Sequence, residues 1–212
     1  MGLIEDRLDG VQAIIFDCDG TLVDSAPLYA TAWAAGLATS GKPMERDWYM
    51  ARSGLSEHVF MDEFEAEANV CLDRQFVVRV VRETFLRGIE NLREIAGVGL
   101  IARMAKPLLP LAVASGGPMA IVQPSLQQAG LLNLFNAVVT IEDVAHPKPA
   151  PDLFLEAARR LDVLPSACLV IEDSPTGLAA AEAAGMAGLS VHDASTLASL
   201  QRRLHSFAEW EG

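Results

Sequence analysis

Acidic residues occur in two short groups that could bind a metal ion and attack an electrophile. Asp17 and Asp19 stand two residues apart in the run DCDGT, and Glu172 and Asp173 are adjacent. Clustered carboxylates repel one another and need a cation between them. Ligands that are all oxygen favour Mg²⁺, which usually takes one or two carboxylates together with waters and a substrate oxygen. If the fold brings the two groups together, the sequence predicts a magnesium site.

The same residues suggest transfer of a phosphoryl group. A carboxylate beside Mg²⁺ can act as a nucleophile, and aspartyl-phosphate is a known covalent form. A second carboxylate two residues further on, the spacing of Asp17 and Asp19, can protonate the leaving oxygen and later activate water. The hydroxyl of Ser115 and the ammonium of Lys148 would balance the charge on the phosphoryl group. The glycine-rich turn after Ser115 would add backbone N–H donors.

Each of these groups belongs to a polar segment that follows a predicted β-strand. The predicted strands are Val11–Phe16, Leu109–Ala114, Ala137–Thr140, Cys168–Ile171 and Gly188–Val191. Helical patterns lie between the later strands, which is typical of βαβ units and of a parallel sheet covered on both faces. In a parallel sheet these strand ends lie on one edge, where open α/β folds bind ligands. We therefore expect Asp17 and Asp173 to lie close together.

A helical insertion is predicted between the first strand and the rest of the sheet. From Asp47 to about Gly88 the chain shows no convincing alternating pattern, and its clear breaks lie near Gly54 and Asn69. We predict an α/β fold with a Rossmann-like parallel sheet core. Residues 1–24 and 92–212 would form that core, and residues 25–91 an inserted all-helical cap domain.

Composition excludes several classes of partner. The formal net charge is −12, which argues against nucleic acids and anionic membranes because binding to either needs a basic face. The three cysteines, odd in number and widely spaced, indicate neither a disulfide framework nor a zinc site. No basic-then-apolar leader and no apolar run of about 20 residues is present. We expect a soluble, cytoplasmic protein, and nothing demands more than a monomer.

Four motifs together resemble the haloacid dehalogenase-like hydrolase superfamily. The motifs are FDCDGTLVDS at 16–25, VASGG at 113–117, HPKPAPDLF at 146–154 and IEDSPTGLAAAEAAGM at 171–186. They occur in the order of the family and cover the chain from end to end. The similarity is to the branch whose helical cap follows the first motif, which includes β-phosphoglucomutase-like and phosphoglycolate phosphatase-like proteins.

The resemblance implies a role for each matching residue. Asp17 would be the nucleophile and a metal ligand, and Asp19 the general acid and base that also binds Mg²⁺ through its backbone carbonyl. Asp173 would bind the metal, with Glu172 supporting it directly or through water. Substrate phosphate would be held by residues of the second and third motifs, which are Ser115, Gly116 and Lys148. The acid at position 19 favours cleavage or transfer of a phosphate ester over dehalogenation.

Three activities remain open at this point. Hydrolysis of a small phosphomonoester, such as a sugar phosphate or similar metabolite, is the function that we predict. A phosphosugar mutase like β-phosphoglucomutase is the first alternative, but Tyr29, Ser53 and Glu57 stand where that mutase carries His, Lys and Arg. An acidic Glu57 would oppose the second phosphate of a bisphosphorylated intermediate. A catalytically silent regulatory or binding protein is the second alternative, and the presence of every catalytic residue type argues against it.

Overall fold

The structure is a computed structural model that describes the backbone of residues 10–210 and the side chains of residues 10–206. The chain forms two compact units. The first, here called the core unit, comprises Met1–Asp24 and Arg93–Gly212, and the second, the helical unit, is Ser25–Leu92. Each unit is described by itself.

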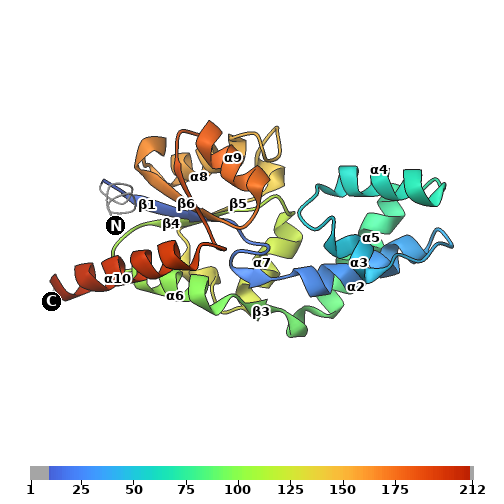
Figure 1. The fold of residues 1–212 in the computed structure, drawn as a ribbon, viewed down its shortest axis with the longest axis horizontal. Helices are drawn as coiled ribbons and strands as arrows, with labels where there is room; N and C mark the ends of the chain where they lie inside the picture. Colours follow the sequence, from blue (N-terminus) through green and yellow to red (C-terminus); the bar gives the residue numbers. More distant parts are fainter. Residues whose placement is uncertain (1–9, 211–212) are drawn as a thin grey trace. The chain divides into compact units, whose positions relative to one another are not determined.

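The core unit is built on a parallel sheet of five strands (Figure 1). In chain order the strands are β1 (Ala13–Phe16), β4 (Leu111–Ala114), β5 (Ala137–Val139), β6 (Cys168–Glu172) and β7 (Ala187–Ser190). Their order across the sheet is β5-β4-β1-β6-β7. Every residue of β1, β4 and β6 is buried, as expected for central strands covered on both faces. The predicted fold class is confirmed, and each strand lies within two residues of its predicted bounds.

Helices cover both faces of this sheet, with α8 and α9 on one face and α6, α7 and α10 on the other (Figure 1). Phe154 and Ala157, one turn apart on α8, are fully buried in the same apolar cluster as Ile15 and Val170 of the sheet. The helices are α6 (Ala96–Ala105), α7 (Met119–Gln128), α8 (Asp152–Leu161), α9 (Pro175–Ala183) and α10 (Ala194–Trp210). Single 3₁₀ turns occur at η2 (Leu132–Leu134), η3 (Ile141–Asp143) and η4 (Pro165–Ala167). Within the described part of the chain, no helix is long and apolar enough to span a bilayer.

A short ribbon, which the sequence did not predict, joins the two points where the chain leaves and re-enters the core unit. Strand β2 (Val23–Asp24) pairs antiparallel with β3 (Arg93–Glu94). The backbone N–H of Ile95 also donates to the carbonyl of Leu22 at 2.9 Å. Two-residue strands carry too little periodicity to be read from sequence.

The helical unit contains four α-helices and one 3₁₀ turn. They are α2 (Ala26–Ala38), α3 (Arg46–Met50), α4 (Glu57–Ala68), α5 (Arg74–Arg87) and η1 (Ile89–Asn91). Gly36 of α2 lets α5 approach closely, because a β-carbon at this position would lie 2.6 Å from a methyl group of Val81. Helix α4 ends at Asn69 in the left-handed conformation, with φ of 51°. The break expected near Gly54 lies in the turn between α3 and α4, and the one near Asn69 lies at the end of α4.

Candidate active site

Asp17 is placed at the centre of the sheet edge by the register of β1. Phe16 pairs with Val113 of β4 on one side and with Ile171 of β6 on the other. The backbone N–H of Asp17 donates to the carbonyl of Ile171 at 2.9 Å. The next residue of each strand therefore reaches the same edge, and the Asp17 side chain is buried there, with 6% of the residue exposed.

Three carboxylates meet at this edge. Asp17, Glu172 and Asp173 each offer an oxygen, and these atoms lie within 4.8 Å of one another. Burial raises the pKa of Asp17 to about 7. The charge of Lys148 lowers this pKa in part, and repulsion from Glu172 and Asp173 raises it further. Burial and then the charge of Glu172 also raise the pKa of Asp173. When all three are ionised, the cluster carries more negative charge than is balanced by the one cation that binds it among the described residues.

Lys148 is that cation. Its Nζ donates to Asp17 Oδ1 at 2.5 Å and to Glu172 Oε1 at 2.8 Å. The same atom lies 4.9 Å from the centre of the Phe154 ring, which is within the range of a cation–π contact. Burial alone would lower the pKa of Lys148, but the charges of Asp17 and Glu172 outweigh it and raise the pKa. Lys148 therefore remains an ammonium ion at the site.

Glu172 is held by donors on both of its oxygens. Oε1 accepts from Lys148, and Oε2 accepts from the backbone N–H of Ser174 at 2.5 Å and from its hydroxyl at 2.9 Å. The hydroxyl oxygen of Ser174 in turn accepts from the N–H of Gly177 and caps the N-terminus of α9. Glu172 thus fixes Lys148 and the start of α9, whereas Asp173 is only half-buried.

Asp173 and the first motif are fitted closely to one another. Thr21 Oγ1 donates to Asp173 Oδ1 at 3.2 Å. Gly20 has φ of +82°, and a β-carbon there would overlap the carboxylate of Asp173. Only glycine adopts this backbone conformation without strain and also leaves room for the acid.

Asp19 and Ser115 come together around Gly117. A β-carbon built on Gly117 would lie 3.4 Å from Ser115 Oγ and 3.5 Å from Asp19 Oδ2. The hydroxyl oxygen of Ser115 accepts from the N–H of Gly117 at 3.0 Å, which fixes its direction. Gly116, between them, is exposed at the tip of the turn. The structure thus places every residue predicted for the site at the carboxyl edge of the sheet.

Two partners of the site were not among the predicted site residues. Thr21 binds Asp173, and Ser174 binds Glu172. Ser174 could be predicted from sequence as a helix cap, because Pro175 follows it. Its bond to Glu172 and the reach of Thr21 across the fold depend on tertiary structure that the sequence pattern does not show.

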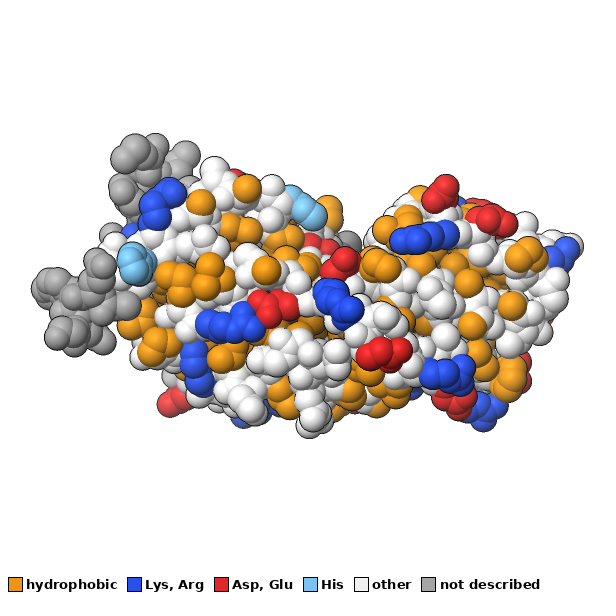
Figure 2. Space-filling model, turned by 90° about the horizontal axis from the view of Figure 1, so that it is seen from below, with side chains coloured by type: hydrophobic (Ala, Val, Ile, Leu, Met, Phe, Trp, Pro, Cys, Tyr) orange, Lys and Arg blue, Asp and Glu red, His pale blue; other side chains and the backbone are white. Residues whose placement is uncertain are grey.

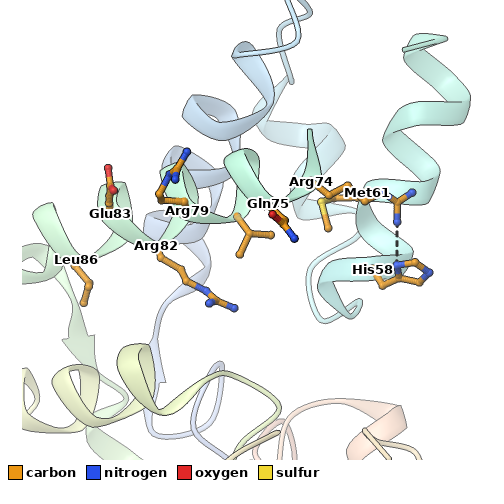
Figure 3. A pocket seen from close by; sticks show the side chains of 9 residues that line it. His58, Met61, Arg74, Gln75, Arg79, Arg82, Glu83 and Leu86 are labelled. Carbon is orange, nitrogen blue, oxygen red and sulfur yellow. Dashed lines mark hydrogen bonds between the residues drawn. The ribbon is translucent and has the colours of Figure 1, made fainter. Parts of the chain in front are cut away.

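The helical unit has an open pocket of about 600 Å³ along α4 and α5 (Figure 3). The lining residues are His58, Met61, Arg74, Gln75, Val78, Arg79, Arg82, Glu83 and Leu86. Arg74 is neutralised by Asp62 and Glu65. Arg82 has its Nη2 3.6 Å from Glu57, while its Nε is buried with no hydrogen-bond partner among the described residues.

Tyr29 and Ser53, two of the three positions that bear on mutase activity, do not line this pocket. Arg52 binds Glu63 and Glu67 at 2.7 and 2.6 Å, so its charge is neutralised within the unit. Ser53 donates to the carbonyl of Met50. The ring of Tyr29 lies 4.5 Å from that of Phe85.

Comparisons with known proteins agree with the geometry. The family model for haloacid dehalogenase-like hydrolase matches residues 11–185. The fructose-1-phosphate phosphatase YqaB of Escherichia coli K12 is 33% identical over 182 residues, which cover 84% of this chain and 95% of that protein. The β-phosphoglucomutase of Bacillus subtilis strain 168 is 28% identical over 198 residues, covering 85% and 83% of the two chains.

A solved structure extends the likeness to three dimensions. CbbY from Rhodobacter sphaeroides, crystallised in complex with phosphate, aligns with a TM-score of 0.75 at 26% identity. The alignment covers 84% of each chain. The matched residues, the order of strands and the cluster of carboxylates lead to one conclusion. This chain belongs to the haloacid dehalogenase-like hydrolase family.

Proposed function

We propose that the protein hydrolyses a small phosphomonoester, with Mg²⁺ bound at the sheet edge and Asp17 as the nucleophile. The observation that carries this proposal is the meeting of Asp17, Glu172, Asp173 and Lys148 around one buried point. The chain is a phosphatase of the phosphomonoester hydrolase class, as its family and its named relatives support.

The residues at the site fit a bound Mg²⁺. Asp17 and Asp173 offer oxygen ligands only, which is the donor chemistry that this ion prefers, and the backbone carbonyl of Asp19 would add a third. A divalent cation would offset the burial and, beyond it, the repulsion from Glu172 that raise the pKa values of both carboxyl groups. Glu172 would support this set through Lys148 and Ser174, because both of its oxygens already accept hydrogen bonds. When bound, the ion would neutralise charge on the phosphate.

The reaction then proceeds in two displacements. A carboxylate oxygen of Asp17 attacks phosphorus, the bond from phosphorus to the ester oxygen breaks, and Asp19 gives its proton to the departing alcohol. In the second step Asp19 takes a proton from water, whose oxygen attacks the same phosphorus. The bond from Asp17 to phosphorus breaks, and inorganic phosphate and the free carboxylate of Asp17 result.

The phosphoryl oxygens are bound by groups around this path. Lys148, which already touches Asp17, would contact the phosphoryl group as it is transferred. The hydroxyl of Ser115 and the backbone N–H of Gly116 would donate from the opposite loop. Ser115 is 1% exposed and its oxygen is fixed by Gly117, so its position is set before substrate binds.

A sugar phosphate or similar metabolite is the substrate class that we propose. YqaB, which carries this specificity in its name, supports that choice. The helical unit would act as the cap and recognise the organic part of the substrate. Lysine and arginine side chains are mixed with aspartate and glutamate on the face shown in Figure 2, which does not favour binding of a nucleic acid to that face. We propose a monomeric, cytoplasmic enzyme.

A mutase is the second candidate. The match to β-phosphoglucomutase favours it, and so does Arg82, which lies close enough to Glu57 to offset the acid that would repel a second phosphate. The two candidates differ in the fate of the phosphoryl group, which goes to water in one case and to a sugar in the other.

The test is a panel of small phosphomonoesters incubated with the full chain, with Mg²⁺ or with EDTA. We expect Mg²⁺-dependent release of phosphate, highest with a sugar phosphate. β-Glucose 1-phosphate is assayed separately for glucose 6-phosphate and for free phosphate. Formation of glucose 6-phosphate without free phosphate would show a mutase. No turnover of any ester would indicate a silent binding protein on this scaffold.

A further inference from the structure

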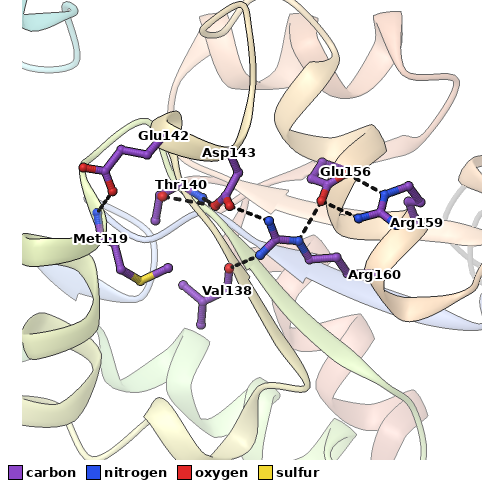
Figure 4. Close-up of polar contacts among 8 residues, drawn as sticks. All are labelled: Met119, Val138, Thr140, Glu142, Asp143, Glu156, Arg159 and Arg160. Carbon is purple, nitrogen blue, oxygen red and sulfur yellow. Dashed lines mark hydrogen bonds and ion pairs between the residues drawn. The ribbon is translucent and has the colours of Figure 1, made fainter.

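The 3₁₀ turn η3 lies between the two loops that carry the phosphate-binding groups of the proposed site. On one side it is attached to the loop of Ser115. The N–H of Ile141 donates to the carbonyl of Gly117 at 3.4 Å, and Glu142 Oε2 accepts from the N–H of Met119 at 3.1 Å, where α7 begins (Figure 4). These two hydrogen bonds couple the position of η3 to that of the Ser115 loop.

On its other side η3 begins the loop that carries Lys148. This loop runs from Asp143 to Asp152, the first residue of α8. Asp143 closes a capping box with Thr140, whose N–H and hydroxyl both donate to Asp143 Oδ2. Asp152 Oδ1 accepts from the N–H of His146 at 3.2 Å, near the middle of the loop. The direction of Lys148 thus depends on how η3 and α8 are spaced.

Arg160 joins these two elements directly (Figure 4). From α8 its Nη2 binds Asp143 Oδ1 at 2.5 Å, and its Nη1 donates to the carbonyl of Val138 in β5 at 2.9 Å. Its Nε binds Glu156 at 2.7 Å, which orients the guanidinium group. One planar group thereby connects a strand, the 3₁₀ turn and the helix at the ends of the Lys148 loop.

We propose that Arg160 is a positioning residue, which clamps η3 to α8 and so sets the distance between Lys148 and the Ser115 loop. The inference rests on the proposed function, because it treats these groups as the donors that hold the phosphoryl group. The hydrogen bonds of Arg160 reach Asp143, Val138 and Glu156 and none of these donors, so Arg160 acts through Asp143. Nothing in the four motifs indicates this role, since residue 160 lies outside all of them.

The electrostatics of the clamp agree with such a role. Partial burial opposes ionisation of Asp143, but the N–H of Thr140 and the charge of Arg160 lower its pKa. The Arg160 side chain is 29% exposed and that of Asp143 is 25% exposed. Ion pairs with this much solvent access contribute little to global stability. Geometry at a reacting centre is less tolerant, because a displacement of about 1 Å can cost on the order of 100-fold in rate.

Arg159 provides a matched control. It is the neighbour of Arg160 on α8 and forms a two-pronged ion pair with the same Glu156, at 2.7 and 2.8 Å. Its side chain is 72% exposed, and within the described residues its hydrogen bonds reach Glu156 and neither η3 nor β5. Arg159→Gln and Arg160→Gln therefore remove the same charge from the same helix, and only the second breaks the clamp.

The experiment compares the full-length wild type with both variants. For Arg160→Gln we expect KM, and the inhibition constant of inorganic phosphate, to rise about ten-fold through misplacement of Lys148. For Arg159→Gln we expect both values to stay within roughly two-fold of the wild type. The Mg²⁺ concentration for half-maximal activity should stay unchanged in both, because the metal ligands do not lie on this loop. Arg160→Lys, which keeps the charge but not the planar fork, should recover only part of the loss.

Asp143→Asn adds a double-mutant cycle. If Arg160 acts through Asp143, the effects of the two substitutions on KM should be far from additive. Equal kinetics for the Arg159 and Arg160 variants would overturn the proposal. So would a parallel loss of thermal stability and Mg²⁺ activation in Arg160→Gln, which would show general damage.

Calorimetric binding of inorganic phosphate in the presence of Mg²⁺ separates the two proposals. A wild type that turned over no ester but bound phosphate, more weakly in Arg160→Gln than in Arg159→Gln, would refute the proposed function and support the clamp. If the wild type turned over esters and the two variants did not differ, the proposed function would be supported and the clamp refuted.

Discussion

The carboxylate cluster of the core unit and the pocket of the helical unit are built in opposite ways. In the core unit, strands β1, β4 and β6 hold short side chains at a sheet edge, and each oxygen of Glu172 has a fixed donor. In the helical unit, the pocket is lined largely by long side chains on two helices, including Arg79 and Arg82. In the first arrangement, strands and hydrogen bonds hold the side chains in place. In the second, residues can be substituted without disturbing a sheet.

Under the proposed function, the core unit would carry out the chemistry and the helical unit would recognise the substrate, and the two constructions suit these tasks. Chemistry at phosphorus tolerates little displacement, which favours groups at the ends of buried strands. Recognition of the organic part of a substrate tolerates adjustment, which suits arginines with several rotatable bonds. We therefore expect substitutions of the reacting groups Asp17 and Asp19 to act on kcat, and substitutions in the pocket to act on KM and on the choice of substrate.

The largest effect is expected at Asp17. Asp17→Asn removes the nucleophile, so kcat should fall by roughly 1,000-fold or more. The fold should be retained, because an amide of the same shape avoids the cost of a buried charge. Asp162→Asn is the control, since Asp162 ends α8 with φ of 58°, a conformation that asparagine tolerates. Full turnover by Asp17→Asn, measured as release of phosphate, would refute nucleophilic catalysis by this residue.

Removal of Mg²⁺ tests the core unit by a different route. The carboxyl of Asp17 has its folded pKa raised to about 7 from 3.8, so between these values the folded state holds a proton that the unfolded state has lost. The metal-free protein should therefore lose stability as pH rises through this window. Because Mg²⁺ competes with that proton, its addition should raise Tm more at pH 8 than at pH 5.5. An equal rise at both values would contradict a metal site that includes Asp17.

The smallest effect is expected in the pocket. Arg82→Ala should raise KM for the preferred substrate several-fold, on the order of one lost charged hydrogen bond. Turnover of p-nitrophenyl phosphate, which lacks the sugar, should remain within about two-fold. Arg87→Ala is the matched control, because Arg87 is exposed on the same helix and does not line the pocket. If Arg82→Ala lowered kcat for both substrates, the proposal that the pocket serves recognition and not chemistry would be refuted.

The sequence predicted the strand ends well because the signals there are local and strong. Each buried run that precedes Asp17, Ser115 or Glu172 is followed at once by polar residues and a helix start, and the structure has a strand in each place. The ribbon β2–β3 has two residues in each strand, which is too short for a periodic signal. The bonds of Arg160 to Asp143 and Val138 join residues 17 and 22 positions apart. No pattern along one helix indicates which of two adjacent arginines faces β5.

The ribbon β2–β3 also affects which changes of sequence the fold can accept in evolution. The chain leaves the core unit after Asp24 and returns at Arg93, and these two residues are paired across the ribbon. An insertion whose ends are already held together can be lengthened, shortened or exchanged without altering the strand order of the sheet. Under the proposed function, the helical unit would therefore be a natural point for recombination, where a different insertion could give the same sheet edge a new substrate range.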